Sequence, residues 1–222
     1  MLVTKLEHSS AGQVKIRPAL SQSSFTILRY DTLLRNQVPY IASPIKDTFQ
    51  LGDTIWIEMD FSDNLTDLHG GITNTFSNFN FKLRFECDRF DINSPQGKAV
   101  SFMDAFPSVG EVVSIVLPIS DVSYFEILPL YEAHMYRFKS AFVLKQQGSF
   151  LCGITPLSDD LAEPFKISGK CDDLPLYVIS KVNNGDSMEN NYHLLKSSKV
   201  PVYRDMTLER FGEGLFCFVV KP

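Results

Sequence analysis

The chain has 222 residues and a net charge of −5, and 44% of its residues are hydrophobic. This length suits one large β-domain or two small ones, and the hydrophobic fraction is sufficient for a full core. The acidic balance argues against non-specific nucleic-acid binding, and no apolar run reaches the ~18 residues of a membrane-spanning helix. Apolar and polar residues instead alternate with a period of two, which predicts an all-β sandwich, immunoglobulin-like or jelly-roll-like.

The predicted strands follow one another along the chain, separated by connections rich in Pro, Gly and Asn. In chain order, strands are expected at residues 13–17, 25–30, 54–61, 72–87, 110–117, 124–131, 134–145, 149–154, 174–182, 200–206 and 214–220. The segment 99–106 fits either a strand or a short helical turn. Residues 187–198 are the best candidate for a short helix, because Met188, Tyr192 and Leu195 share one helical face.

The connections predict how some of these strands are joined. A short turn at 146–148 predicts a β-hairpin between the apolar runs on either side of it. A break at 118–123 is the place where two domains would meet. We expect one elaborated sandwich over 1–222, and the alternative is two small β-domains, 1–123 and 124–222.

The four cysteines have no zinc-binding spacing. Cys152 and Cys171 bracket a loop, and a disulfide between them would stabilise the fold by roughly 3 kcal/mol. Cys87 and Cys217 would form a second pair. The alternative is four buried free thiols, which behave as small hydrophobic side chains.

Residues 148–152 (Gly-Ser-Phe-Leu-Cys) resemble the G-x-Y-x-C pattern of the immunoglobulin F strand. The order of the other landmarks differs from that family, because Trp56 precedes every cysteine. This local resemblance implies a sandwich and does not imply an immunoglobulin domain.

Residues 49–57 contain the sequence Gly-Asp-Thr-Ile-Trp, which resembles a strand of uncharacterised exported β-sandwich proteins from the Bacteroidetes group. The Asn-rich turn at 181–186, the pair 190–191 and the final G-x-F-x-F strand are similar too. The resemblance implies export to the periplasm or cell surface, often as a lipoprotein, and carries no activity. This chain departs from that pattern in having no signal or lipobox cysteine near its start.

The strand at 54–61 carries the candidate ligand site. Its alternation places Trp56, Glu58 and Asp60 on the face opposite the core residues. An exposed aromatic ring beside hydrogen-bonding carboxylates suits a sugar, which needs a flat apolar surface and polar partners for its hydroxyls. The alternative is that a second sheet or a loop covers Trp56 while the carboxylates are solvated.

Other patterns of chemistry are weaker. Asp60, Asp63, Asn64 and Asp67 gather oxygen ligands in one loop, but the spacing is not that of a calcium-binding EF-hand, and ordinary turn composition explains it. The chain has no H-E-x-x-H and no G-x-S-x-G motif. We therefore expect no metal, no cofactor and no catalytic residues.

These observations favour a non-enzymatic exported protein of the cell envelope, with a structural role or with a glycan or protein as binding partner. The alternatives are a hydrolase acting on glycans through a loop-borne site and an intracellular or phage-type assembly protein. No nucleic-acid partner is expected. Contact with a membrane is expected only through a lipid anchor, which this chain lacks. The expected location is the periplasm or cell surface if a signal segment has been removed, and the cytoplasm otherwise.

Overall fold

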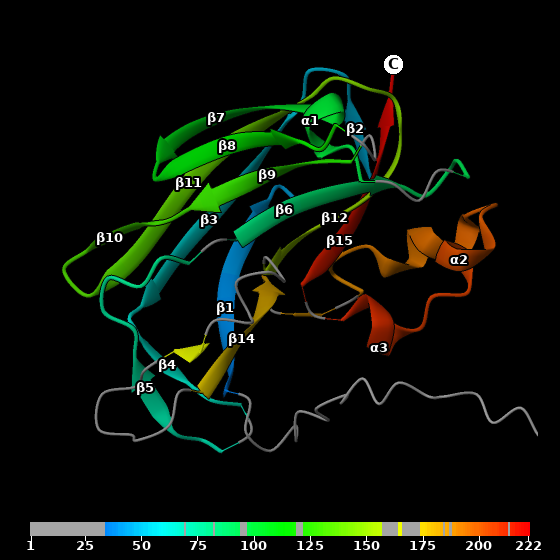
Figure 1. The fold of residues 1–222 in the computed structure, drawn as a ribbon. Helices are drawn as coiled ribbons and strands as arrows, with labels where there is room; N and C mark the ends of the chain where they lie inside the picture. The colour runs from blue at the N-terminus through cyan, green and yellow to red at the C-terminus, as the bar shows by residue number, and fades with distance from the viewer. Residues whose placement is uncertain are drawn as a thin grey trace, which may run out of the picture.

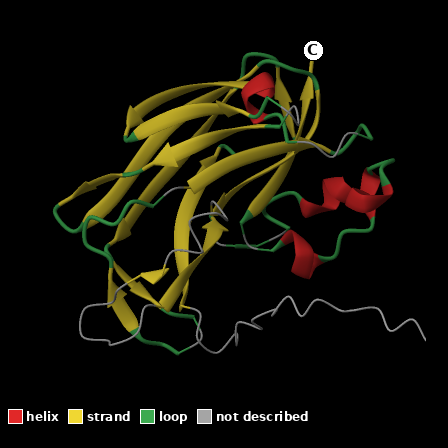
Figure 2. Cartoon of the chain, in the orientation of Figure 1, coloured by secondary structure: helices red, strands yellow, loops and turns green. Residues whose placement is uncertain are grey.

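The computed structural model describes residues 34–68, 70–81, 83–93, 97–118, 122–156, 164–165, 174–183, 185–186, 188–212 and 214–222. Two β-sheets pack face to face over this part of the chain (Figure 1), which confirms the predicted all-β sandwich. Strands dominate, and the short helices gather mainly on one side (Figure 2). The strands expected at 13–17 and 25–30 lie outside the described residues.

The first sheet is built from strands of both chain halves. Its order is β10 (Leu130–Glu132), β11 (Met135–Leu144), β3 (Thr54–Ser62), β1 (Leu34–Ser43), β14 (Leu174–Val182) and β13 (Pro164–Phe165), and β7 (Met103–Val109) also pairs with β11. The β1–β14 pair is parallel, whereas β3 and β11 run antiparallel over their whole length. The long β3–β11 ladder forms the middle of the surface discussed below.

The second sheet has the order β2 (Thr48–Gln50), β15 (Leu215–Lys221), β12 (Gly148–Pro156), β6 (Leu83–Arg89), β9 (Ser123–Leu128) and β8 (Glu111–Val116). A small separate pair, β4 (Asn64–Thr66) and β5 (Thr73–Thr75), lies at one end of the sandwich. The predicted strands at 54–61, 110–117, 174–182 and 214–220 are confirmed. The ambiguous segment 99–106 contains both expected forms, α1 (Ala99–Phe102) and then β7.

Aromatic side chains fill the space between the sheets. Phe142 of the first sheet lies 4.7 Å from Phe85 and 5.3 Å from Phe125 of the second sheet, measured between ring centroids. All three side chains are almost completely buried. Such rings bury large apolar areas and hold the sheets together.

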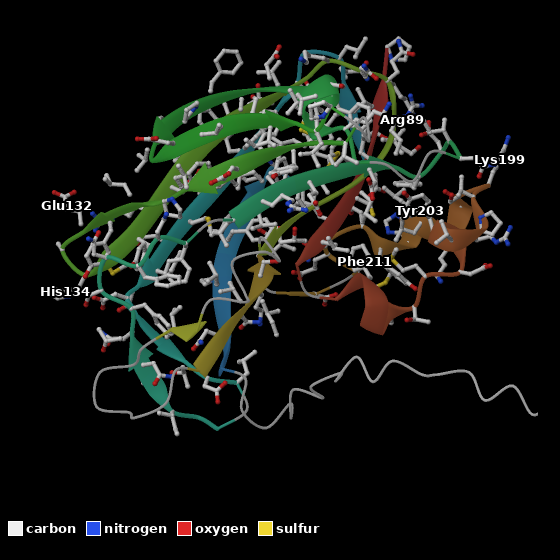
Figure 3. The ribbon with its side chains drawn as sticks, in the orientation of Figure 1. Arg89, Glu132, His134, Lys199, Tyr203 and Phe211 are labelled. Atoms are coloured by element: carbon white, nitrogen blue, oxygen red, sulfur yellow. A yellow bond between two sulfur atoms is a disulfide. The ribbon has the colours of Figure 1, made fainter. Side chains whose placement is uncertain are left out.

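A helical segment covers the outer side of β12 and β15. It comprises η3 (Tyr192–Ser197), α2 (Pro201–Arg204) and α3 (Leu208–Phe211). Tyr192 and Phe211 of this segment pack with Leu151 and Cys217 of the sheet in a second apolar cluster. Figure 3 shows Tyr203 and Phe211 on this side of the molecule. The outer face of the second sheet is therefore partly buried.

Two sequence predictions in this region need correction. The strand expected at 200–206 is wrong, because Pro201 occupies the first turn of α2, where its missing N–H is tolerated. Tyr203 and Met206, three residues apart, then face the same apolar cluster. The helix expected at 187–198 is the shorter η3, in which Tyr192 and Leu195 are buried while Met188 lies outside it and is exposed.

The predicted hairpin around 146–148 is also wrong. β11 belongs to the first sheet and β12 to the second, so the turn carries the chain from one sheet to the other. Leu144 and Phe150, on either side of the turn, both contribute to the shared core. Alternation locates both strands but does not specify which neighbour each one pairs with.

The predicted disulfides are wrong as well. Cys152 bonds to Cys87, which excludes both Cys152–Cys171 and Cys87–Cys217. Cys87 and Cys152 stand directly opposite each other on the neighbouring strands β6 and β12, with Cα atoms 4.2 Å apart. Cys217 faces the helical cover as a buried free thiol, and Cys171 lies outside the described residues.

Candidate functional site

The outer face of the first sheet carries the residues that the sequence singled out. In β3, Ile55, Ile57 and the following odd-numbered residues are buried. Trp56, Glu58 and Asp60 point to the opposite side, as predicted from the alternation. Trp56 is 37% exposed, so no sheet or loop of the described chain buries it. Its role in ligand binding stays a prediction.

The register between strands extends this face beyond β3. Ala141 of β11 stands opposite Trp56, and Phe106 of β7 stands opposite Ala141. Directly paired residues project to the same side of a sheet. Phe106, Ala141 and Trp56 therefore form one line across three strands, which we call the Trp56 row. Phe106 is 58% exposed and Ala141 8% exposed.

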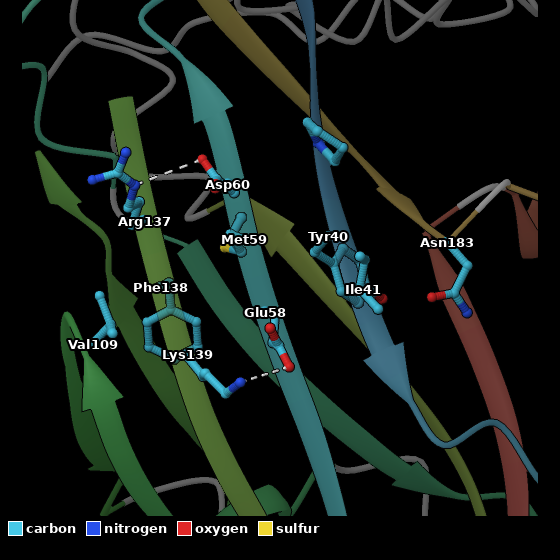
Figure 4. Close-up of a pocket in the computed structure, with 11 residues that line it drawn as sticks. Tyr40, Ile41, Glu58, Met59, Asp60, Val109, Arg137, Phe138, Lys139 and Asn183 are labelled. Carbon is cyan, nitrogen blue, oxygen red and sulfur yellow. Dashed lines mark ion pairs between the residues drawn. The ribbon is translucent and has the colours of Figure 1, made fainter. Parts of the chain in front are cut away.

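Two rows of charges lie beside the Trp56 row. The Lys139 ammonium lies 3.1 Å from the Glu58 carboxylate, and the Arg137 guanidinium lies 3.9 Å from the Asp60 carboxylate. Figure 4 shows both pairs crossing from β11 to β3. The Lys139 ammonium also lies 5.3 Å from the centre of the Trp56 ring. These exposed pairs contribute little stability, and they leave oxygen and nitrogen atoms open to a ligand.

A shallow hollow of about 550 Å³ opens among these charge rows. Its walls include Ile41 of β1, Val109 of β7 and the charged pairs Glu58–Lys139 and Asp60–Arg137 (Figure 4). The volume falls within the range of small-molecule sites, which are concave and combine apolar surface with a few polar groups. The hollow and the Trp56 row together are the candidate ligand surface.

The sequence prediction identified only the β3 part of this surface. Alternation within 134–144 also places Arg137, Lys139 and Ala141 on a single face, so that signal was available. Their position opposite β3 and the position of Phe106 depend on strand register, which alternation within one strand does not specify.

A second polar cluster lies where β3 ends. The buried carboxylate of Asp63 accepts hydrogen bonds from Tyr131 (2.7 Å), His134 Nδ1 (2.9 Å) and the Ser77 hydroxyl (3.0 Å). Donation from His134 and Tyr131 lowers the pKa of Asp63. Its other oxygen, Oδ1, is buried without a hydrogen-bond partner among the described residues. His134 itself is exposed at the tip of the β10–β11 hairpin (Figure 3).

The arrangement of this cluster bears on the acidic loop identified in the sequence. Asp63 points inward, whereas Asp60 pairs with Arg137 on the outer face. Among the described residues, no three His, Cys, Asp or Glu side chains come together to hold a metal ion. His134 is held by Asp63, and the Ser77 hydroxyl donates its hydrogen bond to Asp63 as well, so it is not activated by His134. We interpret the cluster as a structural contact that fixes the β10–β11 hairpin to the end of β3.

A smaller hollow of about 350 Å³ separates the second sheet from α2. Glu86 and Asp88 of β6 line it together with Tyr203 and Met206. Burial, followed by the nearby charge of Glu86, raises the pKa of Asp88 to about 6. Burial and the Asp88 charge raise the pKa of Tyr203 to about 12. Tyr203 of α2 and Asp88 of β6 therefore face each other across this hollow.

No protein-family model matches the chain, and no curated protein matches it. Among solved structures, the chain is similar to the second type II cohesin module from the cellulosomal adaptor ScaA scaffoldin of Acetivibrio cellulolyticus. The two share 6% sequence identity with a TM-score of 0.32, over 67% of this chain and 94% of that one. A likeness of this size says nothing about function. No helix in the described part of the chain has the length and apolarity to cross a membrane.

Proposed function

We propose that this protein is an exported, non-enzymatic binding module that holds a glycan on the outer face of its first sheet. The observation that carries the proposal is the difference between the two outer faces. The helical segment packs over β12 and β15 of the second sheet, whereas Trp56 and Phe106 remain exposed on the first. Exposed aromatic rings with polar groups beside them are suited to a ligand that has both apolar faces and hydroxyls.

The charge pairs support a binding role over a hydrolytic one. Glu58 and Asp60 leave the same strand, and each is paired with a cation of β11. Glycoside hydrolysis needs an acid and a base or nucleophile on opposite sides of the scissile bond. Two carboxylates in adjacent rows of one flat sheet do not provide that arrangement.

The disulfide supports the export part of the proposal. Bonds such as Cys87–Cys152 persist in oxidising compartments and are rare in the reducing cytosol. The resemblance of residues 49–57 to a strand of exported Bacteroidetes proteins points the same way.

An assembly role is the second candidate, and it has its own observation. β8 is the last strand of the second sheet in the described chain, and its Val113 and Val116 are 41% and 60% exposed. Apolar edge strands favour pairing with another chain. Light scattering after size-exclusion chromatography tests this directly. A dimer that Val113→Lys converts to a monomer would favour assembly.

Retention on insoluble polysaccharides tests the proposed function. The panel contains cellulose, chitin, xylan and starch, and the unbound fraction is measured for each. We expect retention by at least one of them, and loss of retention in Ala141→Arg, which places a long charged side chain in the middle of the Trp56 row. Leu208→Arg is the matched control, because it adds the same charge at an exposed position on α3.

Retention of both variants alike would overturn the assignment to this face. No retention of the wild type by any polysaccharide would overturn the glycan proposal itself. Circular dichroism of each variant shows whether the sandwich is intact.

A further inference from the structure

The Trp56 row has a spacing that restricts the shape of its ligand. Trp56 lies on β3 and Phe106 on β7, with one strand, β11, between them. Adjacent strands lie about 4.8 Å apart, so the two aromatic positions are separated by roughly 10 Å. The line joining them runs across the strands. A ligand that contacts both rings must therefore be extended in that direction.

The residue between the two rings has a short side chain that does not rise between them. Ala141 has the shortest side chain that a non-glycine residue can offer, and it is 8% exposed between two larger neighbours. Trp56 and Phe106 remain exposed on either side of it. The Trp56 row therefore presents two aromatic side chains with a short side chain between them. This arrangement suits a polymeric ligand in which every second unit stacks on an aromatic ring.

The charges around the row restrict the chemistry of the ligand. Lys139 with Glu58, Arg137 with Asp60 and Lys145 with Asp104 form three ion pairs on or beside this face. Each pair contains one cation and one anion, so these charges cancel locally. This face therefore has no net charge that would complement a strongly charged partner. It does offer hydrogen-bond donors and acceptors to a neutral polymer rich in hydroxyls.

We propose that the ligand is a linear, uncharged glycan with an extended backbone of the β-1,4 type, which crosses β3, β11 and β7. This inference rests on the proposed function and adds the shape and direction of the ligand. In such a chain successive sugar rings are turned over, so every second ring presents the same face. Alternate rings stack on Trp56 and Phe106, and Lys139 and Glu58 bind hydroxyls of the ring at Trp56.

The test is calorimetric titration with β-1,4-linked glucose, mannose and xylose oligosaccharides of two to six sugars. We expect the affinity to rise by about tenfold or more between the dimer and the tetramer and then to level off, because a second aromatic contact is added. Phe106→Ala is expected to remove this gain, so that the tetramer binds this variant no more tightly than the dimer does. Val116→Ala, a similarly exposed apolar residue on β8, is the matched control.

An α-1,4-linked glucose hexamer tests the shape requirement, because its backbone coils. We expect it to bind at least about tenfold more weakly than the best β-1,4-linked hexamer. Affinity that is independent of length, or a Phe106→Ala protein with wild-type length dependence, would overturn the inference. If polysaccharide retention nevertheless depends on Ala141, the proposed function survives and only the two-platform geometry fails. If no polysaccharide is retained, both fail.

Discussion

Removal of the Cys87–Cys152 disulfide should greatly reduce the stability of the sandwich. The two cysteines are 65 residues apart in the sequence, and the bond closes that length of chain into a loop. The chain-entropy relation for such a loop gives about 4 kcal/mol at room temperature. A loss of this size is a large fraction of the stability of a typical domain.

Urea unfolding with and without a reductant measures this loss. Trp56 is the only Trp of the chain and lies on the first sheet, whereas the disulfide lies in the second, so its fluorescence reports on unfolding beyond the disulfide itself. We expect the reduced wild type and the double variant Cys87→Ala/Cys152→Ala to lose roughly 2–5 kcal/mol. The double variant should no longer respond to the reductant.

Cys217→Ala is the control for loss of a buried thiol. Burial raises the pKa of Cys217 far above its ordinary value, so this thiol stays protonated and unreactive. The variant should therefore respond to the reductant as the wild type does. Equal stability of oxidised and reduced wild type, or a reductant response that depends on Cys217, would refute the pairing.

Three further substitutions test local features of the structure. Asp88→Asn should stabilise the protein by up to about 3 kcal/mol above pH ~6 and by nothing below pH ~4, measured by urea unfolding across this range. The reason is that folding raises the pKa of Asp88 to about 6, so the wild type loses stability as the pH rises from about 4 to about 6. An equal difference in stability between variant and wild type at low and at high pH would contradict this. Gly110→Ala should cost at least about 2 kcal/mol in thermal unfolding, because φ is +75° and the new Cβ would lie 2.7 Å from the Leu128 carbonyl oxygen. Ala133→Asn should stabilise the protein by about 0.5–1 kcal/mol, seen as a higher melting temperature. The reason is that Ala133 has φ of +50° at the hairpin tip, a conformation that Asn tolerates better than Ala. A lower melting temperature would count against this.

The sequence determined which side chains face in and out along each strand. The period of two placed Ile55 and Ile57 in the core and Trp56 on the surface, because this pattern depends only on the geometry of a single strand. The Asn-rich turns were recognisable too. Asn183 and Asn191 both have positive φ, which Asn tolerates better than most residues.

Long-range pairing was the part that the sequence left open. Cys87 meets Cys152 because β6 lies beside β12, and nothing within either strand specifies that neighbour. The same limit applies to the candidate surface. Trp56, Glu58 and Asp60 were visible in one strand, whereas Phe106 joins them only through the register of β7 on β11.

In the proposed function, the binding surface is the outer face of the first sheet. Nuclear magnetic resonance of the isotope-labelled protein, during titration with a soluble oligosaccharide of the polysaccharide that retains it, locates this surface directly. We expect the indole signal of Trp56 and the backbone signals of Phe106, Lys139 and Ala141 to shift together, while those of the helical segment at 192–211 stay in place. Shifts confined to the helical segment or to the β8 edge would contradict it.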